Sequence, residues 1–449
     1  MLHIFVQISK FLLILLILLY TFECFAAFRV EARELRHSVY IRQRVLMYFI
    51  HALAFAVLYF TTMNTQMIGI YVLQCCLITA ILALYHIFYK EANQIILNNM
   101  CMLLIIGFII LTRLSYSKSL KQFFFCLAGL FICVIIPIIM QSVSIFRNLS
   151  WIYAIVGVLG LASVTILGRV EYGAKLSLSF GSFSIQPSEF VKILFVFFLA
   201  SRLYDKKDFK NLLLTGICAA VFMMFLVAAK DLGGAFLYYT TFVIMIYVAT
   251  ERFLYLLGGG GLLAVAAFAG YHIFSHVQVR VLAWLNPLSV YEKEGYQVSQ
   301  SLFGIGTGGW FGLGLNQGLP NKIPIVEKDF VFAAISEELG GIFALCVIFI
   351  CLSVFFMFMN IAIKMRDDFY KLIAIGLATI YALQVFLTIG GTIKFIPSTG
   401  VTLPLISYGG SSLLSTFIFF GIIQGLYVRN MTEEEKGTTD FDEKKTKRK

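Results

Sequence analysis

One carboxylate of the sequence lies where a polar segment meets an apolar one. Asp329 follows Lys328 and precedes the aromatic-rich stretch 330–333. A carboxylate at such a boundary could act as a general base on a substrate held at a membrane surface. It could equally cap the N-terminus of the helix that the aromatic stretch predicts. These residues alone leave both interpretations open.

A second set of ionisable residues lies inside an apolar run. Pro187 suits the first turn of a helix, and Glu189 and Lys192 then share one face of that helix at i,i+3 spacing. Charges at membrane depth are costly and are functional candidates. The pair is either a structural ion pair that joins two helices or the charged wall of a substrate cavity. For Asp231, which follows Lys230, we favour a structural role.

Proline and glycine interrupt the last part of the chain. The stretch 396–412 contains Pro397, Gly400, Pro404 and Gly409 among several hydroxyl groups, which predicts a rigid, broken-helix loop. It is either a kinked helix packed through small residues or the rim of a cavity. Upstream, seven glycines between 304 and 318 predict an irregular external loop. The match of 304–309 to a dinucleotide-binding fingerprint is discounted because no strand precedes it.

The elements that must position these residues are membrane helices. Of the 449 residues 60% are hydrophobic and 13% are charged, against about 25% charged residues in soluble domains. Spanning a bilayer takes about 20 apolar residues. About thirteen runs qualify: 11–28, 45–63, 67–89, 97–113, 123–143, 151–168, 188–203, 211–229, 232–250, 253–274, 339–360, 372–394 and 404–428. The predicted fold class is an all-α polytopic membrane protein.

Basic residues set the predicted orientation. The net charge of +11 comes from short basic loops, which indicates contact with lipid head groups and no nucleic-acid partner. Placing the basic segments 29–44, 204–210 and 364–371 in the cytoplasm puts the N-terminus outside and the C-terminus inside. The large polar segment at about 275–338 then faces outside, as do 169–187 and 395–403. No ATP is available there, so a synthetic reaction needs an activated, lipid-carried substrate.

Five stretches together resemble the bacterial shape, elongation, division and sporulation family (FtsW/RodA/SpoVE). They are 186–192 (Gln-Pro-Ser-Glu-Phe-x-Lys), 231–233 (Asp-Leu-Gly), the run from Gly295 through Gln297 into the glycines, 329–340 with its Glu-Glu pair, and the signature at 397–412. Their order and spacing agree over roughly 97–428. The resemblance implies a ten-helix glycosyltransferase core at 97–429, preceded by an extension with three transmembrane helices at 1–96. Composition predicts a charged, disordered cytoplasmic tail at 430–449.

The resemblance also implies an activity. Family members are peptidoglycan glycosyltransferases of the bacterial cytoplasmic membrane, which polymerise lipid II into glycan strands on its outer face. The donor is a disaccharide-peptide on undecaprenyl pyrophosphate, which agrees with the lipid-carried substrate expected from topology. A class B penicillin-binding protein, which cross-links the strands, is the implied protein partner, and membrane lipids surround the helices.

Site residues follow from the same resemblance. Asp329 is expected to deprotonate the acceptor sugar hydroxyl, and cations should meet the leaving pyrophosphate. The expected substrate-binding residues are Lys175, Glu189, Lys192, Gln297, Ser407 and Ser411. The residues expected to shape the cavity are Asp231, Glu338, Pro397, Gly400, Pro404 and Gly409. No cofactor is certain, although a divalent cation such as Mg²⁺ or Mn²⁺ could share the neutralisation; no ligand is assigned to it.

The chain departs from the family pattern in three places. The first 96 residues are additional. The usual Asn-Gly-Ala-Arg-Arg-Trp stretch reads Tyr-Gly-Ala-Lys-Leu-Ser here, so Lys175 stands for the first arginine, and Thr388 replaces an asparagine. Two other functions remain open on the sequence: a lipid II flippase, and a scaffold without chemistry that recruits a penicillin-binding protein. The sequence does not decide between division, elongation and sporulation.

Overall fold

Nearly every apolar run forms a helix, because backbone inside a bilayer must satisfy its hydrogen bonds within its own segment. The computed structural model describes residues 2–30, 32–142, 145–171, 174–180, 183–205 and 207–446. The helices before the long polar segment are α1 (Leu2–Arg29), α2 (Arg33–Thr62), α3 (Gln66–Phe88), α4 (Gln94–Leu114), α5 (Tyr116–Ser142), α6 (Ser150–Leu167), α7 (Pro187–Leu203), α8 (Phe209–Ala228), α9 (Leu232–Thr250) and α10 (Phe253–Ile273). The others are α11 (Ser275–Leu285), α12 (Tyr296–Gly308), α13 (Val331–Leu339), α14 (Gly341–Lys364), α15 (Asp368–Thr392) and α16 (Gly410–Thr446).

The expected number of membrane spans agrees with this list. Within the described chain, twelve helices are long and apolar enough to cross a membrane. The thirteenth predicted run corresponds to α7, whose 17 residues span about 25 Å at 1.5 Å per residue. This helix packs against α6, α9, α15 and α16 inside the bundle. The prediction of a polytopic all-α membrane protein is confirmed.

The segment 169–187, for which we predicted only an outward-facing loop, contains regular structure. It forms three short antiparallel strands, β1 (Arg169–Glu171), β2 (Ala174–Phe180) and β3 (Phe183–Ile185). Leu178 of β2 lies opposite Ile185 of β3. The alternation of leucine and serine from Leu176 to Ser179 is the period-2 pattern of a half-buried strand. The strands lead directly into the N-terminus of α7.

The three N-terminal helices pack tightly on the rest of the bundle. Helix α1 contacts α2 and α14, and α2 contacts α4. Every residue of α4 from Ile95 to Thr112 is buried, because the extension covers the face of α4 that lipid would otherwise cover. At this interface the Tyr20 hydroxyl donates to Oδ1 of Asn99 at 3.0 Å, and Nδ2 of Asn99 donates to Ser353 at 3.1 Å. These buried polar contacts join the extension to the core.

Two segments are more helical than the sequence predicts. The charged tail, expected to be disordered from residue 430, continues α16 as helix to Thr446. No proline follows Pro404 to stop it, and Arg429 pairs with Glu433 at i,i+4 spacing. The glycines at 304, 306 and 308 lie in α12, so the irregular stretch starts only at Gly309.

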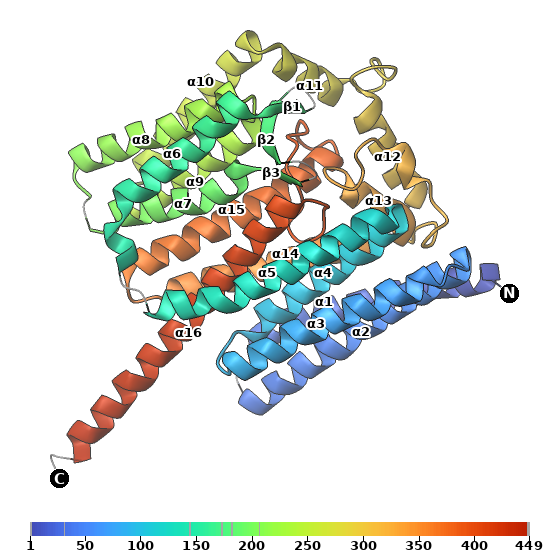
Figure 1. Ribbon diagram of the computed structural model, residues 1–449, viewed down its shortest axis with the longest axis horizontal. Coiled ribbons are helices and arrows are strands. Elements are labelled where there is room, and N and C mark those ends of the chain that lie inside the picture. The colour runs from blue at the N-terminus through green and yellow to red at the C-terminus, as the bar shows by residue number, and fades with distance from the viewer. Residues whose placement is uncertain are drawn as a thin grey trace.

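The long polar segment and the N-terminus lie at the same end of the helices, and the C-terminal helix α16 leaves at the opposite end (Figure 1). The contact is direct, since Nζ of Lys10 donates to the carbonyl of Gly312 at 3.2 Å. Residues 275–338 are not one loop. They hold α11, α12 and most of α13 (Figure 1), and the turn that contains Asp329 directly precedes α13.

Candidate functional site

Asp329 lies in the turn that enters α13 and does not cap it. The N-cap residue of this helix is Phe330, and no side chain makes a capping hydrogen bond. The N-cap interpretation of Asp329 is therefore wrong. In the described part of the chain, no donor forms a hydrogen bond with the Asp329 carboxylate, which is partly buried. The carboxylate is free to act on a substrate.

The backbone beneath this carboxylate is firmly anchored. Three consecutive carbonyl groups accept hydrogen bonds from the segment between α15 and α16 and from the end of α15: Tyr408 N donates to Glu327 at 2.7 Å, Ser407 Oγ to Lys328 at 2.5 Å, and Thr392 Oγ1 to Asp329 at 3.1 Å. Buried carbonyls need such partners, and here the partners also orient the catalytic candidate. The anchored backbone fixes the position from which the carboxylate extends, which is one part of the preorganisation that catalysis requires.

The environment of Asp329 tunes its acidity. Burial raises the pKa of the Asp329 carboxyl to about 6, against the opposing influence of the Lys328 and Arg280 charges. The nearby Glu327 raises the pKa further. A general base is most effective when its pKa approaches the working pH. At neutral pH the group is therefore mostly ionised and is more basic than an ordinary aspartate.

The segment 398–400 joins three parts of the site. Nη1 of Arg280 on α11 donates to the carbonyl of Ser398 at 3.2 Å. The Thr399 carbonyl oxygen would lie 2.7 Å from a β-carbon at Gly233, the third residue of the Asp-Leu-Gly box. Gly400, with φ +77°, lies beside the Asp329 carboxylate. Consecutive residues of one loop thus contact α11, the start of α9 and Asp329.

Arg280 is a site residue that our sequence analysis missed. It is the only arginine between 275 and 338, and it lies on α11, in the segment predicted to face outside. Trp284, one helical turn further, donates through Nε1 to the Lys394 carbonyl at 3.1 Å. The side chains of Arg280 and Trp284 therefore hold α11 against the loop 394–398. The sequence feature that could have identified Arg280 is that it is a lone arginine in a short amphipathic stretch.

Glu189 and Lys192 form the ion pair that their spacing predicts, 2.5 Å apart. Lys192 is only 2% exposed, and its ammonium also donates to Gln384 at 3.2 Å. Ser415 donates to Glu189 at 3.1 Å. The pair thus connects α7 to α15 and α16. This geometry supports the structural interpretation, because a phosphate oxygen would have to displace these partners to reach Lys192.

Three other expected substrate-binding residues have protein partners. The buried Ser407 hydroxyl accepts from Leu403 N at 3.0 Å while it donates to Lys328. The Ser411 hydroxyl accepts a hydrogen bond from the backbone N–H of Gln186 at 3.0 Å. Gln297 on α12 donates to the Pro324 carbonyl at 3.0 Å. These contacts indicate positioning roles for Ser407 and Gln297. Lys175 lies on β2, and its side chain is outside the described part of the structure.

Two acidic cavity residues have structural partners. Asp231 is the N-cap of α9 and accepts from Gly234 N at 2.8 Å, which is the structural role that we favoured. Glu338 is fully buried on α13 and pairs with Arg113 of α4 at 2.9 Å. A buried carboxylate needs such a partner. The pair joins the helix that follows Asp329 to the most buried helix of the bundle.

The proline- and glycine-rich stretch is a non-helical segment between α15 and α16, not a kinked helix. Residues 393–409, which include Pro397 and Pro404, carry no helix. Thr388, at the position where the family has asparagine, donates to the Val401 carbonyl at 2.8 Å and fastens the segment to α15. Gly409 directly precedes α16. The segment lies against Asp329 and forms one side of the site.

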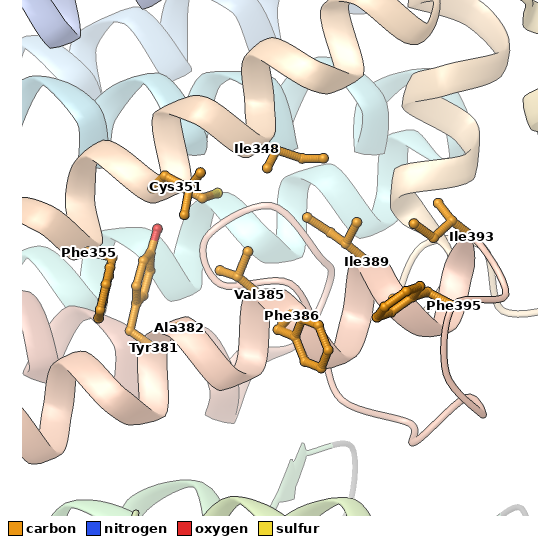
Figure 2. A pocket seen from close by; sticks show the side chains of 12 residues that line it. Ile348, Cys351, Phe355, Tyr381, Ala382, Val385, Phe386, Ile389, Ile393 and Phe395 are labelled. Carbon is orange, nitrogen blue, oxygen red and sulfur yellow. The ribbon is translucent and has the colours of Figure 1, made fainter. Parts of the chain in front are cut away.

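An apolar groove lies behind this segment. It encloses about 200 Å³ between α14 and α15, and Figure 2 shows Phe386, Ile389, Ile393 and Phe395 along it. The twelve lining residues carry no charge, so the groove takes no part in acid–base chemistry. It ends at Phe395, at the edge of the loop that reaches Asp329.

A metal site of the usual kind is not formed by the described residues. Among them, no three His, Cys, Asp or Glu side chains gather closely enough to hold an ion. The divalent cation that we considered therefore has no protein cage in this part of the chain.

The arrangement matches that of a known family. The family model FtsW/RodA/SpoVE, described as a cell cycle protein, matches residues 93–431. The peptidoglycan glycosyltransferase RodA of Mycobacterium tuberculosis is 34% identical over 330 residues, covering 69% of this chain and 70% of the relative. The chain belongs to the FtsW/RodA/SpoVE family. Helices α1–α3 precede the matched region, and α4–α10 and α14–α16 form its ten-helix core.

Other proteins are similar to this chain in sequence or in fold. Stage V sporulation protein E of Bacillus subtilis is 35% identical over 269 residues, covering 57% of this chain and 72% of the relative. In fold, a solved peptidoglycan synthase complex contains a chain that matches with a TM-score of 0.63 at 22% identity, covering 75% of this chain and 97% of that one. Thermus thermophilus RodA matches with a TM-score of 0.55 at 20% identity, covering 76% and 97%.

Proposed function

We propose that this chain is a peptidoglycan glycosyltransferase that polymerises lipid II on the outer face of the bacterial cytoplasmic membrane, with Asp329 as general base. The observation that carries the proposal is the state of Asp329. Its backbone is anchored by Thr392, its carboxylate has no hydrogen-bond partner among the described residues, and its pKa is raised to about 6. Relatives named peptidoglycan glycosyltransferase support the class of reaction.

The chemistry forms one bond and breaks one. The acceptor hydroxyl oxygen bonds to the anomeric carbon of the donor while the bond from that carbon to the pyrophosphate oxygen breaks. The pyrophosphate leaves with the electron pair, and the hydroxyl proton passes to the Asp329 carboxylate, which later releases it to water. Glycosyl transfers pass through a transition state with oxocarbenium character. Removal of the proton and stabilisation of the leaving group therefore both lower the barrier.

The topology of the molecule supports an outer-face reaction. Lys10 near the N-terminus contacts Gly312, so the N-terminus and the segment 275–338 share one side. The basic C-terminal end lies on the other side (Figure 1). Cytoplasmic segments attract Lys and Arg, so we assign the C-terminal side to the cytoplasm and the N-terminal side, with Asp329, to the exterior. The lipid-carried donor is available there.

The decisive experiment incubates the purified full-length protein with fluorescent lipid II. Growth of glycan polymers supports the proposal. A second assay in liposomes follows transfer of lipid II between leaflets. Transfer without polymer would make the chain a flippase, and neither activity would make it a scaffold. Either of those two results overturns the proposal.

We also propose a class B penicillin-binding protein as the partner. A solved structure of this fold belongs to a complex that coordinates polymerization and crosslinking. An enzyme that makes uncross-linked strands requires a transpeptidase nearby. Co-expression of the two proteins should yield a complex that survives purification in detergent and polymerises lipid II faster than the chain alone. Elution as separate species with unchanged rate would contradict this partnership.

A further inference from the structure

Arg280 is a cation of the described site that has most of its hydrogen-bond donors free. Among the described residues its one hydrogen bond is from Nη1 to the Ser398 carbonyl. A guanidinium carries five N–H donors in a planar fork, so four donors remain for a ligand. The residue is half-buried. A half-buried arginine with most of its donors free is suited to binding a phosphate in a bidentate manner.

Its position relative to Asp329 is defined by the loop 398–400. Arg280 contacts Ser398, and Gly400, two residues on, lies beside the Asp329 carboxylate. The Arg280 charge is close enough to lower the pKa of Asp329. A group bound to the free donors of Arg280 would therefore lie near the general base. A leaving pyrophosphate, separated from the base by the anomeric carbon and the attacking hydroxyl, would lie in this neighbourhood.

Three lysines at or near the site whose side chains the structure describes are less suitable than Arg280. Lys192 is buried and engaged by Glu189 and Gln384. Lys118 pairs with Glu327. The charge of Lys328 also lowers the pKa of Asp329, but an ammonium is a point charge without the planar fork that matches phosphate oxygens. Arg280 combines free donors with the required geometry.

A second polar group shares this face of α11. His276 precedes Arg280 by four residues, so the two side chains are neighbours on the helix. Nε2 of His276 is shielded from solvent and has no hydrogen-bond partner among the described residues. Shielded polar atoms normally have partners. An unpaired one next to a free guanidinium indicates a surface that a polar ligand completes.

We propose that Arg280 binds the pyrophosphate of the lipid-linked donor and stabilises the negative charge that forms on the leaving oxygen. This inference rests on the proposed function and adds the residue that meets the leaving group. Before the reaction, the guanidinium of Arg280 forms hydrogen bonds with the pyrophosphate. As the bond to the anomeric carbon breaks, the electron pair moves onto the pyrophosphate oxygen, and the hydrogen bonds from Arg280 strengthen.

The test compares Arg280→Gln and Arg280→Lys with the parental protein. Arg252→Gln, at the exposed opposite end of α10, is the matched control. Loss of one preorganised donor to a developing anion costs about 10²–10³-fold in rate. We expect a loss of this size for Arg280→Gln, about tenfold for Arg280→Lys, which keeps the charge without the fork, and none for Arg252→Gln. The lysine variant keeps the test decisive if the glutamine variant does not fold.

Two readouts separate substrate binding from a merely structural role. Affinity for undecaprenyl pyrophosphate should fall at least tenfold in Arg280→Gln and stay unchanged in Asp329→Asn. The acidic limb of the pH–rate profile should move to higher pH in Arg280→Gln, because a cation that lowers the pKa of Asp329 is lost. Parental affinity and an unshifted profile in folded Arg280→Gln would overturn the inference. The proposed function would not be overturned by that result, because it is tested separately by the polymerisation rate of Asp329→Asn.

Discussion

A β-carbon placed on Gly400 would lie 3.8 Å from Oδ2 of Asp329. Gly400 also has φ +77°, a conformation that side-chain-bearing residues rarely adopt. The positive φ favours a glycine here, whereas a β-carbon alone would make only an ordinary contact with the carboxylate, and a longer side chain would reach into the space beside it. The residue belongs to the loop that contacts Arg280, the start of α9 and Asp329.

Larger residues at position 400 should therefore impair catalysis. Gly400→Ala forces a left-handed conformation that costs about 1–2 kcal/mol, and Gly400→Leu also fills the space at Asp329. We expect at least a tenfold lower polymerisation rate for the leucine variant. Gly409→Ala is the control, because a β-carbon there makes only ordinary contacts of 3.7–3.8 Å. Equal rates for Gly400→Leu and Gly409→Ala would contradict this role.

Thr392 and Ser407 should act by positioning the backbone of Asp329. Thr392→Val and Ser407→Ala each leave a carbonyl of 328–329 without its donor, at a cost of about 1–3 kcal/mol. We expect each change to lower kcat by about three- to tenfold with little effect on KM, and the double variant to lose more. Steady-state kinetics with lipid II checks this. A raised KM at constant kcat would instead indicate direct substrate contact.

The Glu189–Lys192 pair should matter for stability more than for chemistry. Lys192→Met leaves Glu189 without its cation, and breaking a buried ion pair on one side costs about 3–5 kcal/mol. The double change Glu189→Gln with Lys192→Met should recover most of this loss and keep the rate within about tenfold of the parental value. Thermal unfolding in detergent and polymerisation measure the two effects. A double variant that is stable but inactive would restore the cavity-wall interpretation.

Sequence patterns predicted the helices and Asp329 for clear physical reasons. A helix that spans a bilayer needs a long apolar run, so each helix can be predicted from its own stretch of sequence. Asp329 was recognised by its boundary position and its motif. Arg280 was not, because it lies about fifty residues away from Asp329 along the chain and only the loop 398–400 brings the two together.

Other features depend on tertiary contacts that composition does not reveal. The spacing of Glu189 and Lys192 predicted their pairing, but not that Gln384 and Phe419 would surround Lys192. Ser407 was expected at the substrate, yet its hydroxyl is used by Leu403 and Lys328. The short strands of 169–185 were overlooked because the segment was judged by its polarity instead of its alternation.

The pH dependence follows from the raised pKa of Asp329. The base must be ionised, so the polymerisation rate should fall about tenfold per pH unit below about pH 6 and level off above it. The contribution of Asp329 to the free energy of unfolding changes with pH in the opposite direction to the rate. Because the folded protein holds the Asp329 proton more tightly than the unfolded chain, its contribution to the free energy of unfolding decreases as pH rises from about 4 to about 6. A rate that stays constant down to pH 5 would contradict the assignment.

The most direct test of Asp329 as general base is polymerisation of lipid II by purified Asp329→Asn protein. Loss of a general base costs about 10²–10⁴-fold in rate. The asparagine also removes a carboxylate whose ionisation burial disfavours, so the variant should unfold at the same or a higher temperature than the parental protein at pH 7.5. We expect Asp329→Asn to be a folded, substrate-binding protein that makes almost no glycan. Glycan chains that lengthen at the parental rate would contradict it.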